Sequence, residues 1–188
     1  MSGAMNRQVQ LSAGPCKTRA TLVSTAMASK VGEPWKMPPL AKVYEALGAL
    51  GDRRVLIDDE QHARVLSSDR SKTYLVEISA DGREISSNDN SSYWQGYLGY
   101  PAIAVMLRRG LCPVRAEATS ALSGIAWNQL NRQFRNDYDR TIEEVMRRAE
   151  ERGFDPRMIA AEAAAVLLKL SALAPLRGAR RRPAQSSG

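Results

Sequence analysis

The chain has 188 residues, of which 44% are hydrophobic, and a formal net charge of +7. This length suits one domain of ordinary size, or one domain with a helical appendage. Its apolar runs fall short of the roughly 18 residues that a membrane span needs, so no membrane partner is expected. With no secretory signal and only two dissimilar cysteines, Cys16 and Cys112, we expect a reducing, cytoplasmic compartment.

The positive charge is concentrated at the two ends of the chain. No acid precedes Glu33, and residues 177–188 contain none. Eight cations lie in these ends: Arg7, Lys17, Arg19, Lys30, Arg177, Arg180, Arg181 and Arg182. The other 19 of the 27 cations face all 20 acids, so the middle of the chain is almost neutral. Basic arms are typical of proteins that contact a polyanion, although such tails also serve solubility alone.

The chain opens with a segment that shows no sustained hydrophobic period. Residues 1–36 are therefore predicted to form a flexible basic arm. Pro38 and Pro39 then precede a predicted helix that ends at Gly51. Its apolar residues recur every three or four positions and define one buried face: Leu40, Val43, Tyr44, Leu47 and Leu50. This helix begins an α+β domain that we expect over residues 37–112.

Short apolar segments follow and predict the strands of a small sheet. They are residues 55–57, 63–66 and 73–79. The last alternates best and turns one set of side chains inward: Tyr74, Val76 and Ile78. Asp81-Gly82 is a strong hairpin signal, because glycine accepts a positive φ, and residues 83–86 form the predicted return strand. After a polar loop over residues 86–92, Pro101 marks the start of a short helix that ends at Gly110.

Residues 63–110 resemble a SWIM zinc-finger domain, a β-hairpin and helix with a Cys-x-Cys and Cys-x-His ligand pattern. The likeness lies in the strand segments at residues 64–69 and 72–76 and in the helix at residues 101–107. The ligand positions fall on side chains that cannot bind zinc: Ile85, Ser87, Gly99 and Pro101. We therefore predict a degenerate, metal-free finger without a cofactor.

Four aromatic residues crowd the segment where the zinc ligands are missing: Tyr93, Trp94, Tyr97 and Tyr100. One interpretation is an aromatic core that replaces the metal, since each ring buries about 150–250 Å². The other is a surface platform on which bases stack, with Trp94 and Tyr97 as the exposed pair. The first interpretation is the one we expect for most of these rings.

The C-terminal part is predicted to be helical. Over residues 117–152 apolar residues recur every three or four positions, which predicts a long helix with Gly124 as a candidate interruption near its start. The recurring residues are Trp127, Leu130, Phe134, Tyr138, Ile142, Val145 and Ala149. Asp155-Pro156 provides an N-cap and a first-turn proline for a second helix that ends at Ala172. Residues 113–174 should thus form a helical hairpin, docked on the domain or on a second copy. Residues 175–188 are expected to be a disordered basic tail.

No catalytic constellation is apparent, and we expect a protein that is not an enzyme. The single histidine, His62, has no evident nucleophile partner, and neither a Walker loop nor a Gly-x-Gly-x-x-Gly motif is present. The SWIM resemblance implies a nucleic-acid-binding accessory protein, because such modules are associated with helicase-like, transposase-related and chromatin proteins. In a prokaryote it would be nucleoid-associated. The alternative is a protein–protein adaptor that docks a partner through the finger or the helical hairpin.

The candidate nucleic-acid-binding residues come from three places. The tails contribute cations that contact phosphate: Lys17, Arg19, Arg177, Arg180, Arg181 and Arg182. The hairpin contributes Arg64, Arg70, Lys72 and Arg83. Trp94 and Tyr97 are the candidate stacking residues, and these positions do not distinguish DNA from RNA.

Overall fold

A buried helix, α1 (Leu40–Gly51), and a five-stranded sheet form the centre of the computed structural model, which describes residues 32–185. Every residue from Ala41 to Ala49 is buried, because α1 packs against helices on several sides. Those neighbours are α2 (Tyr100–Arg108), α3 (Ala116–Ala121), α5 (Tyr138–Glu151) and α6 (Pro156–Leu173). Helix α4 (Trp127–Gln133) lies between α3 and α5 in the chain. The fold class is α+β, as the sequence predicted.

The sheet is an antiparallel meander to which the C-terminal segment adds a last strand. Its order is β1-β2-β3-β4-β5. The strands are β1 (Val55–Ile57), β2 (His62–Leu66), β3 (Thr73–Ile78), β4 (Glu84–Ser87) and β5 (Leu176–Arg177). The turn between β3 and β4 contains Gly82 at a φ of 72°, as expected for the Asp-Gly hairpin. Strand β5 pairs with β4 in parallel.

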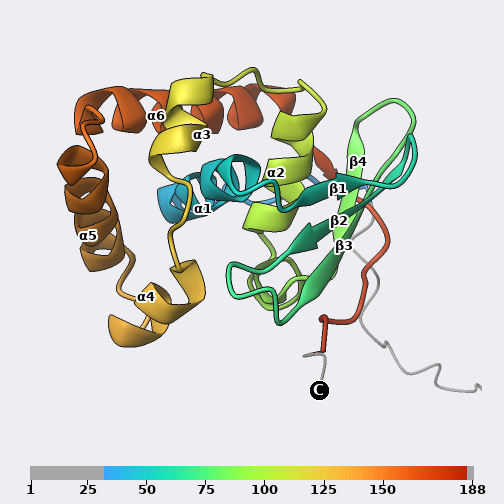
Figure 1. Cartoon of the computed structure of the whole chain (residues 1–188). Helices are drawn as coiled ribbons and strands as arrows, with labels where there is room; N and C mark the ends of the chain where they lie inside the picture. The colour runs from blue at the N-terminus through green and yellow to red at the C-terminus, as the bar shows by residue number, and fades with distance from the viewer. Residues whose placement is uncertain (1–31, 186–188) are drawn as a thin grey trace, which may run out of the picture.

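One face of the sheet packs on α2 and the other faces solvent. Figure 1 shows the helices gathered on one side of the strands. The inward residues are buried: Val55, Ala63, Val65, Val76, Ile78 and Ile85. On the opposite face Leu56 and Leu75 are exposed, because alternate side chains of a strand point to opposite sides. The core therefore lies between the sheet and the helices.

The long helix predicted over residues 117–152 is wrong, because this stretch contains three helices. Gly124, Arg135 and Asn136 have positive φ values, which no α-helix accommodates. Asp137 then begins α5 anew, its side chain accepting a hydrogen bond from the backbone N–H of Arg140. The apolar period continued through the breaks because each short helix turns its own apolar residues to the same core.

The disordered tail expected from residue 175 does not describe residues 176–185. Strand β5 fills the edge of β4, where unpaired backbone groups would otherwise remain. The contacts continue past it, since the N–H of Gly178 donates to the carbonyl of Ile85 over 2.9 Å. The predicted N-terminal arm also has an ordered end, because the N–H of Arg177 donates to the carbonyl of Glu33. Residues 1–31, including Lys17 and Arg19, lie outside the described part.

A buried carboxylate, Asp89, connects the places where the zinc ligands of the resembled finger would lie. It accepts hydrogen bonds from the hydroxyls of Ser87 and Ser92 over 2.8 and 2.6 Å. The Ser92 hydroxyl in turn accepts from the N–H of Gly99. This Asp89 cluster thus joins β4 to a π-helical turn, η1 (Ser91–Gln95), and to the start of α2. Within residues 32–185 no group of three or more His, Cys, Asp or Glu could hold a metal ion.

The expected core of four aromatic rings does not form at this point, although Tyr100 packs against the hydrophobic core. All four rings are partly or fully exposed, and Trp94 has 68% of its surface exposed. Only Ser92 of η1 is buried, because this short turn faces the Asp89 cluster with its serine and turns Tyr93 and Trp94 outward. Tyr100 instead contacts Tyr74 edge to face, with ring centroids 5.8 Å apart. Hydrogen bonding, and not ring burial, therefore holds this region together.

Candidate functional site

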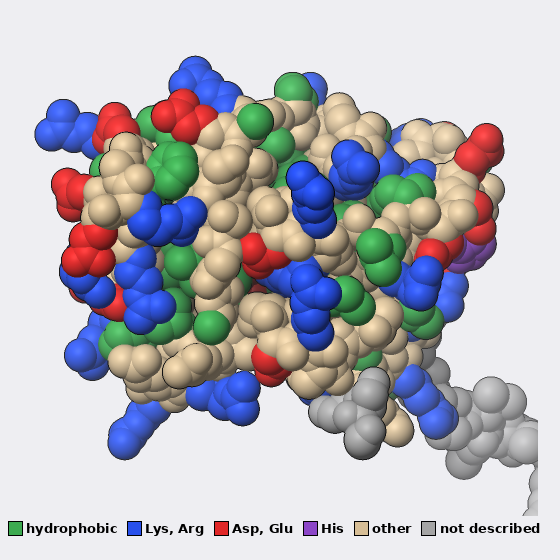
Figure 2. All heavy atoms as spheres, viewed as in Figure 1, with side chains coloured by type: hydrophobic (Ala, Val, Ile, Leu, Met, Phe, Trp, Pro, Cys, Tyr) green, Lys and Arg blue, Asp and Glu red, His purple; other side chains and the backbone are tan. Residues whose placement is uncertain are grey.

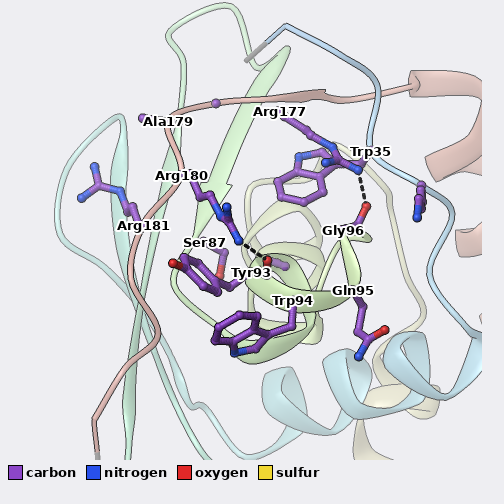
Figure 3. Close-up of a pocket in the computed structure, with 13 residues that line it drawn as sticks. Trp35, Ser87, Tyr93, Trp94, Gln95, Gly96, Arg177, Ala179, Arg180 and Arg181 are labelled. Carbon is purple, nitrogen blue, oxygen red and sulfur yellow. Dashed lines mark hydrogen bonds between the residues drawn. The ribbon is translucent and has the colours of Figure 1, made fainter. Parts of the chain in front are cut away.

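A groove with a cavity volume of about 470 Å³ lies between η1 and the C-terminal segment (Figure 3). We call it the aromatic–arginine groove. Four segments that are far apart in the sequence line it. They are the approach to α1 with Trp35 and Lys36, the end of β4 with Ser87, η1 with its end at Gly96, and residues 177–181.

The groove exists because the C-terminal segment is tied to the end of η1. Gly96 ends this turn at a φ of 73°, a conformation that favours glycine. Its carbonyl accepts a hydrogen bond of 2.6 Å from the Arg177 guanidinium (Figure 3). A Cβ at Gly96 would lie 2.9 Å from that guanidinium, so a larger residue there would shift the end of the Arg177 side chain. The backbone N–H of Lys36 reaches the same carbonyl.

Two guanidinium groups of the groove lie over aromatic rings. Arg180 lies over the Tyr93 ring at 3.9 Å from its centroid, and Arg177 lies over the Trp35 ring at 4.8 Å. The Trp94 ring meets Tyr93 edge to face, with centroids 4.6 Å apart. In Figure 3 the Trp94 ring lies at the edge of the group, consistent with its large exposure. An exposed indole beside cations offers a stacking surface for another planar group.

The charge of the lining has one sign. Lys36, Arg177, Arg180 and Arg181 line the groove, and no carboxylate does. Arg181 forms an ion pair with Glu77 behind the lining and donates to the Ser86 hydroxyl. The Nε of Arg177 is buried and has no hydrogen-bond partner within the described residues. A buried guanidinium donor without an acceptor is costly, and a ligand anion would satisfy it.

Several predicted site residues come together here, and others do not. Trp94, Arg177, Arg180 and Arg181 line the groove, and Arg182 follows them with an exposed side chain. Tyr97 is half-buried outside the groove, and burial raises the pKa of its hydroxyl. Its backbone forms a bridge with Lys36.

The hairpin cations lie elsewhere and form no common patch with the groove. Arg64 makes an ion pair of 2.7 Å with Asp58 on the open face of the sheet. Arg70 occupies a turn with a positive φ, and Arg83 follows the hairpin turn. Lys72 lines a different cavity. Figure 2 shows basic side chains scattered over the visible face with acidic ones among them, unlike the groove lining.

Among the aromatic and charged residues of the groove, sequence reasoning missed three: Trp35, Lys36 and Tyr93. A signal existed for the first two, since an aromatic residue beside a lysine at the end of a basic arm is typical of polyanion contacts. No local signal existed for their meeting with Arg177, because Trp35 and Arg177 meet only through the folded chain. Tyr93 was assigned to a core that does not form.

Comparison with known proteins adds a family assignment. No curated protein and no solved structure matches this chain. A family model described as uncharacterised conserved protein UCP014422 matches residues 35–175. That range holds the aromatic side of the groove and α1 to α6, and it ends just before β5. Because the match covers well over half of the sequence, the chain belongs to the UCP014422 family.

Proposed function

We propose that the protein is a non-enzymatic nucleic-acid-binding accessory protein and that its aromatic–arginine groove holds a single strand. The observation that carries this proposal is the lining, which combines four cations, no carboxylate and an exposed indole. Single-stranded DNA and RNA are bound by grooves of this composition, because phosphates need cations and unpaired bases offer a π-face. The SWIM-like interpretation of residues 63–110 supports the same class of function.

A single strand fits this groove better than a duplex does. In a duplex the faces of the bases are stacked on one another, so Trp94 would have no face to contact. The described cations outside the groove are interspersed with acids, as the Arg64 ion pair with Asp58 illustrates. A duplex needs a broader basic surface, because it presents phosphates on two strands.

The guanidinium groups can serve the fold and the ligand together. A guanidinium has five N–H donors. The side-chain hydrogen bond of Arg177 to Gly96 uses Nη2, and those of Arg181 to Ser86 and Glu77 use Nε and Nη2. The intramolecular bonds fix the planes of the two groups, so less side-chain entropy is lost when a phosphate binds.

The first prediction tests the stacking role of Trp94. Replacing it with alanine should weaken binding of a fluorescent oligothymidylate or oligouridylate by about 1–3 kcal/mol, or roughly 5- to 150-fold. Fluorescence anisotropy at low salt measures this loss, and Trp94→Phe should retain most of the affinity. Leu168→Ala is the matched control, since Leu168 is a large apolar side chain with 74% of its surface exposed. Equal affinities of Trp94→Ala and Leu168→Ala would contradict the proposal.

A protein–protein adaptor is the second candidate, and two exposed leucines of α6 are the observation that favours it. Leu168 and Leu173 expose 74% and 42% of their surfaces on this helix. Exposed apolar side chains contribute to docking where they belong to a contiguous patch. The adaptor predicts no binding of single strands or duplexes at low salt, so the same anisotropy measurement separates the two candidates.

A further inference from the structure

A second cavity of about 490 Å³ lies between α1, β3 and the helices α4 and α5. It shares no lining residue with the aromatic–arginine groove. Its polar lining includes Lys42, Glu45 and Asn131, and aromatic rings of Tyr74, Tyr100 and Tyr138 also line it. The volume lies in the range of about 300–1,000 Å³ that small-molecule sites occupy.

Lys42 brings a buried positive charge to this cavity. Only 8% of its side chain is exposed, and its Nζ lies 2.7 Å from Oε1 of Glu45. Burial alone would lower the pKa of Lys42, but the charge and the hydrogen bond of Glu45 outweigh burial and raise the pKa. The ammonium group also lies over the Tyr138 ring, 4.8 Å from its centroid. Its three N–H donors have one acceptor, Glu45, within residues 32–185.

Asn131 supplies the complementary acceptor. Its Nδ2 donates over 3.2 Å to Oε1 of Glu45, the oxygen that also accepts from Lys42. Its Oδ1 is buried and has no donor within the described part of the chain. Because both residues bond one oxygen, Lys42 and Asn131 are neighbours. Together they present N–H donors beside a carbonyl oxygen that lacks a partner.

The charges that line the cavity compensate one another. Glu45 balances Lys42, and Asp69 lies 3.5 Å from the Arg132 guanidinium. Hydrogen bonds from Ser67 and Ser71 lower the pKa of Asp69, so this carboxylate stays charged. Two further charges, Lys72 and Asp89, have opposite signs. The lining therefore has no net charge to attract an anion or a cation.

We infer that this cavity binds a small, neutral polyhydroxylated molecule through two adjacent hydroxyl groups. One hydroxyl accepts from Lys42, and its neighbour donates to Oδ1 of Asn131. A hydroxyl carries one donor and two acceptor sites, so a vicinal diol can accept from a further N–H of Lys42 and donate to Oδ1 of Asn131, which has no donor within the described residues, without adding charge. The tyrosine rings provide apolar surface for the C–H groups of such a molecule. Both a free sugar and the ribose of a nucleoside have this chemistry.

Titration of the full-length, isotope-labelled chain with millimolar D-glucose, D-ribose, adenosine, 2′-deoxyadenosine and inorganic phosphate tests the inference by nuclear magnetic resonance. The expected result is a saturable shift of cavity resonances with a sugar or with adenosine. Adenosine binding at least about tenfold tighter than 2′-deoxyadenosine identifies the ribose as the source, because the deoxy compound lacks the diol. Shifts with a hexose alone identify a free sugar. No saturable shift with any polyol, or tighter binding of phosphate, would overturn the inference.

A variant pair separates binding from folding. Asn131→Leu removes the acceptor without a partner and should weaken polyol binding at least about tenfold. It also removes the hydrogen bond to Glu45, so near-ultraviolet circular dichroism first checks that the variant is folded. Gln129→Leu is the control on the same helix, with an exposed side chain, and should bind normally. Lys42→Met leaves the Glu45 carboxylate buried without its ion-pair partner. The fold of this variant is therefore checked before its polyol binding is measured. Undiminished binding by folded Asn131→Leu would contradict the inference.

Discussion

Sequence patterns predicted the apolar core better than the two candidate sites, and the charged residues of α1 show why. The apolar period of α1 predicted one buried face, yet Lys42 and Glu45 lie on the same helix and are also buried. The reason is that α1 is surrounded by other helices, so even its polar positions lose contact with water. Two oppositely charged residues three positions apart could have been identified as a pair, but not as a buried one.

At the same scale, Tyr74 gives the protein a predictable response to alkaline pH. Burial raises the pKa of its hydroxyl to about 12, from about 10 in the unfolded chain. The neutral form is the one that the fold favours, so stability is intact below pH 10 and is lost as the pH rises toward 12. At pH 11 the free energy of unfolding should have fallen by about 1.4 kcal/mol through this residue alone.

Tyr74→Phe tests this expectation, because phenylalanine cannot ionise. Urea unfolding at neutral pH and at pH 11 should show a smaller loss for the variant, by about 1.4 kcal/mol. Other tyrosines with raised pKa values, such as Tyr44, leave part of the pH dependence in place. If the wild type and Tyr74→Phe lose equal stability between neutral pH and pH 11, the Tyr74 hydroxyl is hydrated in the folded chain as well as in the unfolded chain.

Among the secondary-structure elements, those with a clear period and a clear boundary could be predicted. The helix after Pro39, the meander with its Asp-Gly turn and the helix that begins at Pro156 all appear close to their expected places. The breaks between α3, α4 and α5 could not be predicted as easily. They depend partly on Arg135 and Asn136 in left-handed conformations, which non-glycine residues adopt only where tertiary contacts compensate.

At the junction of β4, η1 and α2, the packing predicts how a substitution of Gly99 changes stability. Gly99 has a φ of −70°, which any residue can adopt, but a Cβ there would lie 2.0 Å from Oδ1 of Asp89. Gly99→Ala should therefore displace Asp89 from its serine partners and cost about 3 kcal/mol, the upper end for overpacked sites. Chemical denaturation measures this cost.

Gly110→Ala is the matched control for that substitution. Gly110 has a φ of 75° and nothing within 4 Å of its Cβ position, so its cost is conformational only, about 1–2 kcal/mol. If Gly99→Ala is the milder of the two, the Asp89 cluster adapts to the added methyl group and does not fix this junction.

On the scale of the whole molecule, the groove arises from segments that no local pattern connects. Arg177 and Gly96 are 81 positions apart in the sequence, and Arg181 and Glu77 are 104 apart. Because β5 joins the sheet, the last arginines return to η1 instead of extending into solvent. The charge of the basic tail made it a candidate binding element in the sequence, whereas its place beside Trp94 could not be predicted.

The position of the C-terminal arginines in the groove predicts how salt should affect the binding of a single strand. If the four groove cations neutralise four phosphates of a single strand, the slope of log affinity against log salt is about −2.8. Raising salt from about 50 to about 200 mM should then weaken binding about 50-fold. A chain that begins at residue 32 lacks the cations of the arm, including Lys17 and Arg19, yet it retains the groove and should keep this slope. The difference from the full chain measures what the arm adds.

Arg180→Gln should reduce that slope by about 0.7, because one phosphate contact is lost, and should weaken all sequences alike. Arg157→Gln is the charge-matched control, since Arg157 is an exposed residue at the start of α6 and lies outside the groove lining. Near-ultraviolet circular dichroism checks that both variants keep their fold. Removing residues 1–31 shows whether the N-terminal arm or the groove binds phosphate. If binding and its salt dependence vanish with that arm while Arg180→Gln changes nothing, phosphate is bound by the arm and the groove is not the binding site.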